Sequence, residues 1–94
     1  DFLSTDVGDL TIDDLVIYPN PSRDIFNISF NSETIQDIEI RVVNMIGEKV
    51  FLQKLDQFVG KHTTQVDLSK YSKAAYFLEI KNSKGIILEK LVLQ

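Results

Sequence analysis

The sequence contains no cysteine and no tryptophan, and its 94 residues include one histidine, one methionine and two prolines. Without cysteine, a disulfide framework, a thiolate zinc site and a cysteine nucleophile are excluded. No apolar run approaches the roughly 20 residues that a membrane helix needs, so we expect no membrane insertion. A chain of this length forms one domain, which buries roughly 60–70% of its extended surface on folding.

The negative charge is concentrated at the start of the chain. Residues 1–14 carry five aspartates and no basic residue, whereas residues 15–94 carry ten Lys and Arg against nine Asp and Glu. We interpret residues 1–14 as an acidic linker or leader, cut from something longer because the chain starts at Asp1 without a methionine. The near-neutral remainder lacks the clustered basic surface that nucleic-acid binding requires, so no nucleic-acid partner is expected.

From Leu15 onward, short runs of β-type residues alternate with turn signals, which is typical of an all-β protein. Within most runs apolar side chains recur at every second position, as in a strand with one buried face. The pattern predicts an antiparallel β-sandwich of seven strands over residues 15–94. The predicted strands are Leu15–Tyr18, Ile25–Phe30, Asp37–Asn44, Glu48–Leu55, Lys61–Leu68, Ala75–Lys81 and Ile86–Leu93.

The stretch Tyr18-Pro19-Asn20-Pro21 separates the first two predicted strands. Because proline has no N–H to donate, this segment cannot run through the middle of a sheet. We therefore expect it to end an edge strand and to fix the path into the next strand. Gly47 and Gly85 are expected to supply the positive φ of tight hairpins, and Gly60 a further turn.

Few residues suggest chemistry. His62 is the single histidine, and we interpret it as a solvated residue near a strand start, since sequence spacing gives it no nucleophile and no orienting partner. The aspartates of residues 1–14 do not follow the spacing of a calcium loop and are interpreted as a solvated linker. No phosphate loop, carboxylate pair or metal-ligand cluster is present, so no cofactor and no enzymatic activity are expected.

Three apolar residues, Val43, Phe51 and Phe77, fall on the predicted outer face. Exposed, they would form a platform for a carbohydrate or a protein; buried, they would be the second face of central strands. We favour packing.

Three motifs, in order, resemble the C-terminal sorting domain of the type IX (Por) secretion system over residues 15–94. They are "IYPNPSRDIFNISF", "IRVVNMIGEKVF" and "VDLSKYSKAAYFLEIKNSKGIILEKLVL". The residues that match the family pattern, and that the resemblance marks as motif or recognition residues, are Tyr18, Pro19, Asn20, Pro21, Asn44, Gly47, Tyr76, Gly85 and Lys90.

Two positions depart from the family pattern. Asp24 stands where the family has the glycine after the proline motif, and Ala74 stands where it has the glycine before Tyr76. Asp tolerates the left-handed backbone region better than most residues, so the first turn is expected to persist. Alanine lacks that tolerance, so the loop before Tyr76 is expected to differ in shape.

The resemblance implies an immunoglobulin-like sandwich that acts as a secretion signal at the end of an exported protein. It implies an upstream cargo domain, an outer-membrane translocon that recognises the final strands, and a sortase-like peptidase that cuts in residues 1–14. The implied location is the cell surface, reached through the periplasm and the outer membrane. Two other classes stay open: an accessory carbohydrate- or protein-binding module with Phe51, Tyr71 or Phe77 exposed in a row, and a structural spacer.

Overall fold

The computed structural model describes residues 11–94, which form five strands of one antiparallel sheet and no helix. The strands are β1 Ile12–Tyr18, β2 Ile25–Val43, β3 Lys49–Asp67, β4 Ala75–Asn82 and β5 Gly85–Val92. The all-β antiparallel class is therefore confirmed. No part of the described chain is a helix long and apolar enough to cross a membrane.

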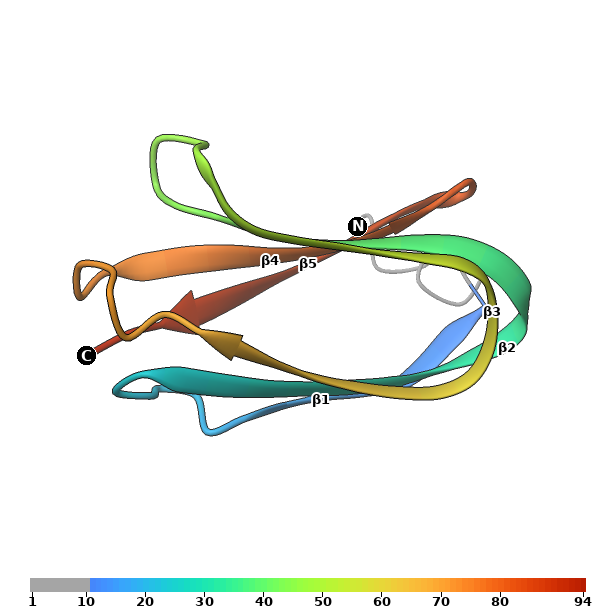
Figure 1. Ribbon diagram of the computed structural model, residues 1–94, viewed down its shortest axis with the longest axis horizontal. Helices are drawn as coiled ribbons and strands as arrows, with labels where there is room; N and C mark the ends of the chain where they lie inside the picture. The colour runs from blue at the N-terminus through green and yellow to red at the C-terminus, as the bar shows by residue number, and fades with distance from the viewer. Residues whose placement is uncertain (1–10) are drawn as a thin grey trace.

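The sheet is folded over on itself because its two longest strands are bent. β2 pairs with β3 from Ile25↔Asp67 to Val43↔Lys49, so the two strands curve together. The first half of β2 also pairs with β1, whereas its second half also pairs with β4, which continues to β5. Figure 1 shows the result: the β1 half and the β4–β5 half face each other, joined through the curved β2–β3 pair.

The prediction of seven strands was wrong, because four predicted runs are the halves of β2 and β3. The stretches between the runs, the mostly polar Asn31–Gln36 and the Gly-terminated Asp56–Gly60, break the alternation and suggest turns. In the structure they stay in the strands and bend them. The β2–β3 register shifts between Ser32 and Ile38, and positive φ angles occur at Gln57 (50°) and Gly60 (101°).

Side chains satisfy the polar groups inside this bend. The hydroxyl of Ser32, which is 1% exposed, donates to the carbonyl of Thr34 and accepts from Gln36 Nε2, both at 2.8 Å. Gln36 Nε2 also donates to Thr11 Oγ1 (2.8 Å), and Gln36 Oε1 accepts from Asn82 Nδ2 (2.7 Å). Because unsatisfied buried polar groups are costly, this network lets a strand bend instead of ending.

Alternation along the strands fills the space between the two halves. Phe26, Ile28 and Phe30 point inward from one half of β2, and the residues of Ile38–Val42 at even positions point inward from the other. The rest of the buried cluster comes mainly from β4 and β5, with single residues of β1 and β3 and of the segments after β3 and β5: Ile12, Val66, Leu68, Tyr76, Leu78, Ile80, Ile87, Leu91 and Leu93. The core therefore lies between the halves, as the period of two predicts.

β1 begins three residues earlier than predicted. Ile12 is 5% exposed and belongs to the core, whereas the sequence pattern places residues 12–14 in the acidic leader. A bulge between Asp13 and Val16, with Asp14 at φ 56°, breaks the alternation that would have revealed the strand. Residues 1–10 of the expected leader lie outside the described residues, so the leader stays a prediction.

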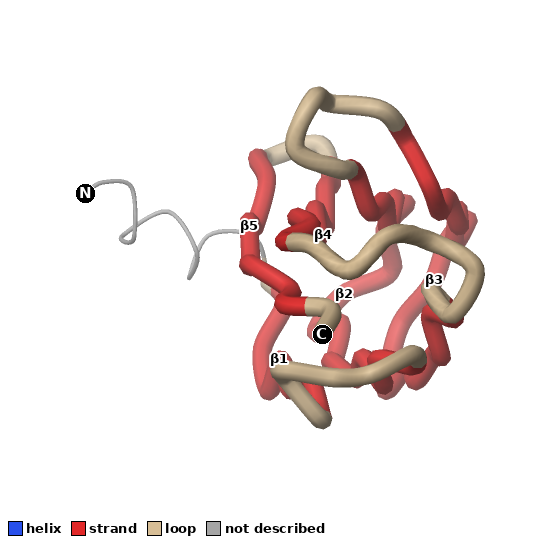
Figure 2. Tube along the Cα trace, turned by 90° about the vertical axis from the view of Figure 1, so that its left-hand side faces the viewer, coloured by secondary structure: helices blue, strands red, loops and turns tan. Residues whose placement is uncertain are grey.

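The loops gather at two opposite ends of the molecule (Figure 1). The end that we call the motif end contains residues 19–24, 44–48, 68–74 and 93–94. The other, the bend end, contains the curved parts of β2 and β3 and the β4–β5 hairpin. Figure 2 shows that β1 and β5 lie on one side of the molecule and β3 on the opposite side.

Gly60 provides a test of the bend. A Cβ at this position would meet no atom within 4 Å, so the cost of Gly60→Ala comes from the backbone at φ 101° alone. We expect a loss of about 1–2 kcal/mol in the free energy of unfolding, measured by urea titration. The neighbouring exposed residue gives the control: Val59→Ala should change stability by about 0.5 kcal/mol or less. Equal losses for the two variants would contradict a bend that depends on Gly60.

Candidate functional site

Asn20 holds the end of β5 through its side chain. Its Nδ2 donates to the carbonyl of Lys90 (2.8 Å), and its Oδ1 accepts from the N–H of Val92 (3.0 Å). The flanking residues Pro19 and Pro21 have no N–H, and both are preceded by cis peptide bonds. The side-chain amide of Asn20 thus takes the place that a backbone peptide group has in a strand ladder.

Ser22 extends this ladder to the last residues of the chain. Its N–H donates to the carbonyl of Val92 (3.0 Å), and its carbonyl accepts from the N–H of Gln94 (2.9 Å). On the other side of the strand, the N–H of Leu93 donates to the carbonyl of Ala74 (2.9 Å). The final residues are therefore hydrogen-bonded along both edges.

The loops of the motif end are also bonded to one another. The N–H of Leu68 donates to the carbonyl of Asp24 (2.8 Å), and Lys73 Nζ donates to the carbonyl of Arg23 (2.5 Å). Tyr76, 3% exposed, donates its hydroxyl proton to the carbonyl of Ser72 (2.6 Å) and so anchors the loop before β4. A buried ring with a hydrogen-bonded hydroxyl fixes loop and core together.

The β2–β3 hairpin stands beside this loop. Asn44 organises it: its Oδ1 accepts from the N–H groups of Ile46 and Glu48, and Gly47 takes the expected positive φ, 87°. A hollow of about 300 Å³ lies between the hairpin and the loop before β4. Two apolar side chains of the hairpin remain exposed: Met45 at 64% and Ile46 at 80%.

The structure thus brings most of the predicted motif residues to one end. Gly85 is the exception: it opens β5 opposite Asn82 at the bend end, and its expected positive φ does not occur. Asn82 organises that hairpin instead, because its Oδ1 accepts from the N–H groups of Lys84 and Gly85. The predicted residues at or next to the motif end are Tyr18, Pro19, Asn20, Pro21, Asn44, Gly47, Tyr76 and Lys90.

Neither departure from the family pattern uses a left-handed backbone, since neither Asp24 nor Ala74 has a positive φ. Asp24 forms its turn through its side chain: Oδ1 accepts from the N–H of Ile25 (2.7 Å), and its own N–H donates to Ser22 Oγ (3.3 Å). This turn therefore does not use the tolerance of aspartate for the left-handed region. Sequence reasoning also missed Ser22, which is 5% exposed, although a small hydroxyl residue beside two prolines is a signal for such a turn.

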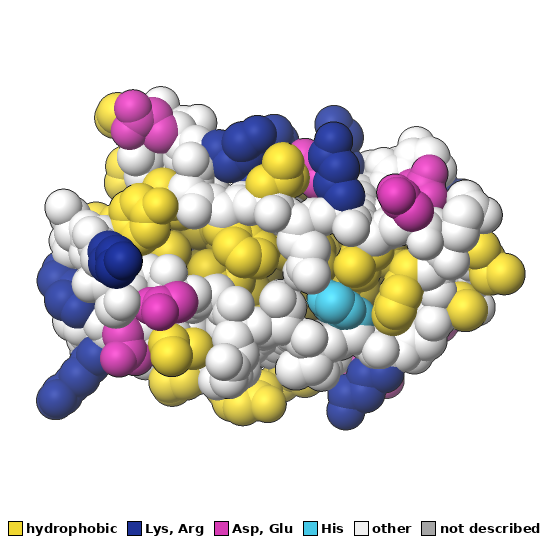
Figure 3. All heavy atoms as spheres, in the orientation of Figure 1, with side chains coloured by type: hydrophobic (Ala, Val, Ile, Leu, Met, Phe, Trp, Pro, Cys, Tyr) yellow, Lys and Arg dark blue, Asp and Glu magenta, His cyan; other side chains and the backbone are white. Residues whose placement is uncertain are grey.

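His62 is not the solvated residue that we expected. It lies half-buried in the middle of β3, with ring centroids 5.6 Å from Phe30 and 5.5 Å from Phe58. Its Nε2 lies 3.4 Å from Gln53 Oε1, and burial lowers the pKa of the imidazole. Figure 3 shows the ring among hydrophobic side chains, in a band between the two halves of the sheet. The contacts of His62 are therefore those of a side chain that packs within the fold.

The row of exposed aromatic residues that the alternative binding module requires does not form. Phe51 pairs with buried Val42 and packs against the core, whereas Phe77 pairs with Val43, one residue along β2 and hence on the opposite face. Tyr71 is exposed in the loop before β4. Its hydroxyl donates to the carbonyl of Val50 (3.4 Å). The packing interpretation therefore holds for Phe51, which packs against the core, whereas Val43 and Phe77 are half-buried on the outer face.

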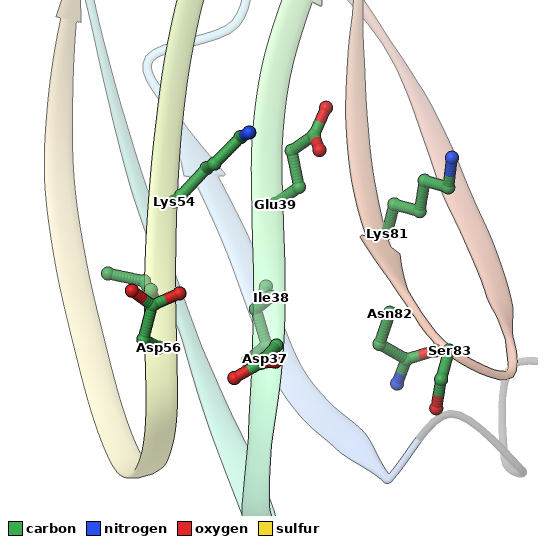
Figure 4. A pocket seen from close by; sticks show the side chains of 9 residues that line it. Asp37, Ile38, Glu39, Lys54, Asp56, Lys81, Asn82 and Ser83 are labelled. Atoms are coloured by element: carbon green, nitrogen blue, oxygen red, sulfur yellow. The ribbon is translucent and has the colours of Figure 1, made fainter.

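A hollow of about 310 Å³ on the outer face carries several charges near the bend end. Figure 4 shows Lys54, Glu39 and Lys81 on the neighbouring strands β3, β2 and β4. Glu39 lies 3.8 Å from Arg41, whose guanidinium makes a shorter ion pair with Glu79 (2.6 Å). These alternating charges support cross-strand pairing. Residues 11–94 contain no group of three or more side chains placed to hold a metal ion.

Comparison with known proteins identifies the family. The sequence model of the secretion system C-terminal sorting domain matches residues 16–94, so the chain belongs to this family of type IX secretion signals. No curated protein matches the chain. Membership supports a sorting signal for type IX secretion, and it implies an upstream cargo domain, the type IX machinery and export across the outer membrane.

Asn20→Ala tests the hold on β5. The substitution removes both side-chain hydrogen bonds, so we expect a stability loss of about 1 kcal/mol and about fivefold faster hydrogen exchange at the Val92 amide. Asn31→Ala is a matched control, because Asn31 makes its side-chain bond with Asp13 of β1 and not with a backbone group of β5. Unchanged protection at Val92 in Asn20→Ala would show that the side chain does not hold the strand.

His62 predicts a pH dependence of stability. Burial lowers the pKa of the folded state below the ordinary value of 6.5, so the unfolded state binds more protons just below pH 6.5. Stability should therefore fall as the pH drops from about 7.5 to about 5.5, and His62→Gln should show a smaller fall. Urea titrations at several pH values measure this; identical slopes for both proteins would exclude a contribution from His62.

Proposed function

We propose that this domain is a C-terminal secretion signal, which directs an attached cargo through the outer-membrane type IX translocon and is then removed by a sortase-like peptidase. On this proposal the folded sheet is the immunoglobulin-like sandwich that the family resemblance implies, built from five strands with two of them bent. The cargo reaches the cell surface, and the domain itself performs no reaction.

One observation carries the proposal beyond family membership. The first and third family motifs are far apart in the sequence, yet Asn20 and Ser22 of the first are hydrogen-bonded to Lys90 and Val92 of the third. Ser22 also accepts from the N–H of Gln94, the residue after the third motif. The first motif therefore holds the final strand in an ordered conformation, and a receptor can bind this strand without first ordering it. Rigid presentation lowers the entropic cost of recognition.

The start of β1 limits where removal can occur. From Ile12 onward the backbone is paired with β2, and a paired strand does not fit the extended binding cleft of a peptidase. We therefore place the cleavage before Thr11, which narrows the expected processing region of residues 1–14.

The experiment fuses residues 1–94 to a neutral reporter in a host that carries the type IX translocon. We expect the reporter at the cell surface, with a new C-terminus before Thr11 detected by mass spectrometry, because the signal is read and then removed. The same reporter without the fusion should stay in the periplasm and serves as the control. A fused reporter that also stays in the periplasm would overturn the sorting function, and surface reporter that retains the whole domain would overturn its removal.

Deleting β5 would be a poor test of recognition. The deletion also removes Ile87, Leu91 and Leu93 from the core, so lost export would not separate recognition from folding.

Substitutions at exposed positions separate recognition from folding better. We expect Met45→Ser/Ile46→Ser at the motif end to reduce export, and Val59→Ser at the bend end to leave it unchanged.

A further inference from the structure

β5 is an edge strand, and only its last part is covered. It pairs with β4 on one side, and Asn20 and Ser22 occupy its other side from the carbonyl of Lys90 to the N–H of Gln94. Upstream of Lys90, no backbone group of another strand among residues 11–94 pairs with that side of β5.

The direction of the uncovered groups follows from the covered ones. The N–H and carbonyl of Val92 both point away from β4, toward Asn20 and Ser22. In an antiparallel strand these directions alternate residue by residue, so the peptide groups of Ile86 and Leu88 also point outward. Both side chains are exposed, Ile86 at 41% and Leu88 at 58%. This open edge can accept a further strand.

A groove of about 650 Å³ lies beside the open edge, between β5 and β1. Ile12 and Ile87, which are buried, and Ile17 form apolar parts of its wall. Figure 2 shows β1 and β5 on the same side of the molecule, away from β3. A strand added to β5 would therefore point alternate side chains into this groove.

The groove is acidic. Asp13, Asp14 and Glu89 line it, and the part of the chain that the structure describes places no basic residue in its lining. Asp13 and Asp14 lie at the bulge in β1, where Asp14 has a φ of 56°. A hydrogen bond with Asp13, and then the charge of Asp13, raise the pKa of the neighbouring Glu33 on β2.

We propose that the open edge of β5 binds an extended segment of a partner protein by strand addition, and that this segment carries Lys or Arg on the side that faces the groove. Main-chain hydrogen bonds to Ile86 and Leu88 supply the pairing, and Asp13, Asp14 and Glu89 select basic side chains. This inference rests on the proposed sorting function, because a sorting signal has to be bound by a protein receptor.

Charge argues against the other candidate strands. Pairing β5 with β5 of a second copy would bring two sets of Asp13, Asp14 and Glu89 together. The chain's own residues 1–10 carry three aspartates and no basic residue, so they have the same sign as the groove. Like charges at close range disfavour both.

Two synthetic ten-residue peptides test the surface: one alternates lysine with valine, and the other alternates glutamate with valine. Each is titrated against the 94-residue protein by fluorescence anisotropy, and backbone amide shifts map the contact. We expect the lysine peptide to bind at β5 residues 86–90 and the glutamate peptide to bind at least about tenfold more weakly.

Matched variants separate charge from pairing. The double variant Asp14→Asn/Glu89→Gln should lower the affinity for the lysine peptide about fivefold. The control Glu48→Gln/Asp56→Asn changes the net charge by the same amount at exposed sites elsewhere, and it should leave that affinity unchanged. Leu88→Pro removes the outward N–H and should abolish binding, whereas Leu88→Ala keeps that N–H and should retain binding. Thermal melts check that each variant folds. If Leu88→Pro fails to fold, the comparison of the two double charge variants decides whether the lysine peptide binds at this groove.

Several outcomes would overturn the inference: equal binding of both peptides, shifts that map to β3 instead of β5, dimerisation through β5, or equal effects of the two charge variants. The reporter fusion then distinguishes the two proposals. If the wild-type fusion is exported and the Leu88→Pro and Asp14→Asn/Glu89→Gln fusions are exported equally well, the strand-addition site is refuted and the sorting function stands. If the wild-type fusion is not exported, the sorting function fails, and the peptide titration still decides on the surface.

Discussion

The pairing of two long bent strands is the constraint on which the rest of the molecule depends. β2 and β3 hold each other along most of their length, and each contributes to both halves of the folded sheet. β1 and β4 attach to different halves of the same strand, β2, so their facing positions are set by its curvature. The core and the placement of the loops at two ends both follow from this bend.

The alternation of apolar residues predicts the strand class and most of the core, because a period of two is a local property of a buried strand face. The number of strands was not predictable in the same way. Asn31–Gln36 is polar enough for a loop, and inside the bend the side chain of Gln36 is bonded to Thr11 and Asn82, which are distant in sequence. A tertiary network thus decides between a loop and a bend, and no local pattern reveals it.

The candidate site was predicted as a set of motif residues, but not as an arrangement. The two prolines correctly indicated the end of an edge strand, since their missing donors are a local property. The role of Asn20 depends on β5, which lies some 70 residues later, so its spacing in the sequence gave no indication of it. An asparagine between two prolines is nevertheless a usable signal, because its side-chain N–H can make the hydrogen bond that the neighbouring proline nitrogens cannot.

The chain enters and leaves this domain at opposite ends, which has a mechanical consequence. Thr11 bonds with Glu33 at the bend end, whereas Gln94 bonds with Ser22 at the motif end. A force between a preceding segment and a grip on the final residues would therefore run along β1 and β5 and load their hydrogen bonds in shear. Bonds loaded in shear share the force instead of breaking one after another, so the fold is built to resist tension along its long axis.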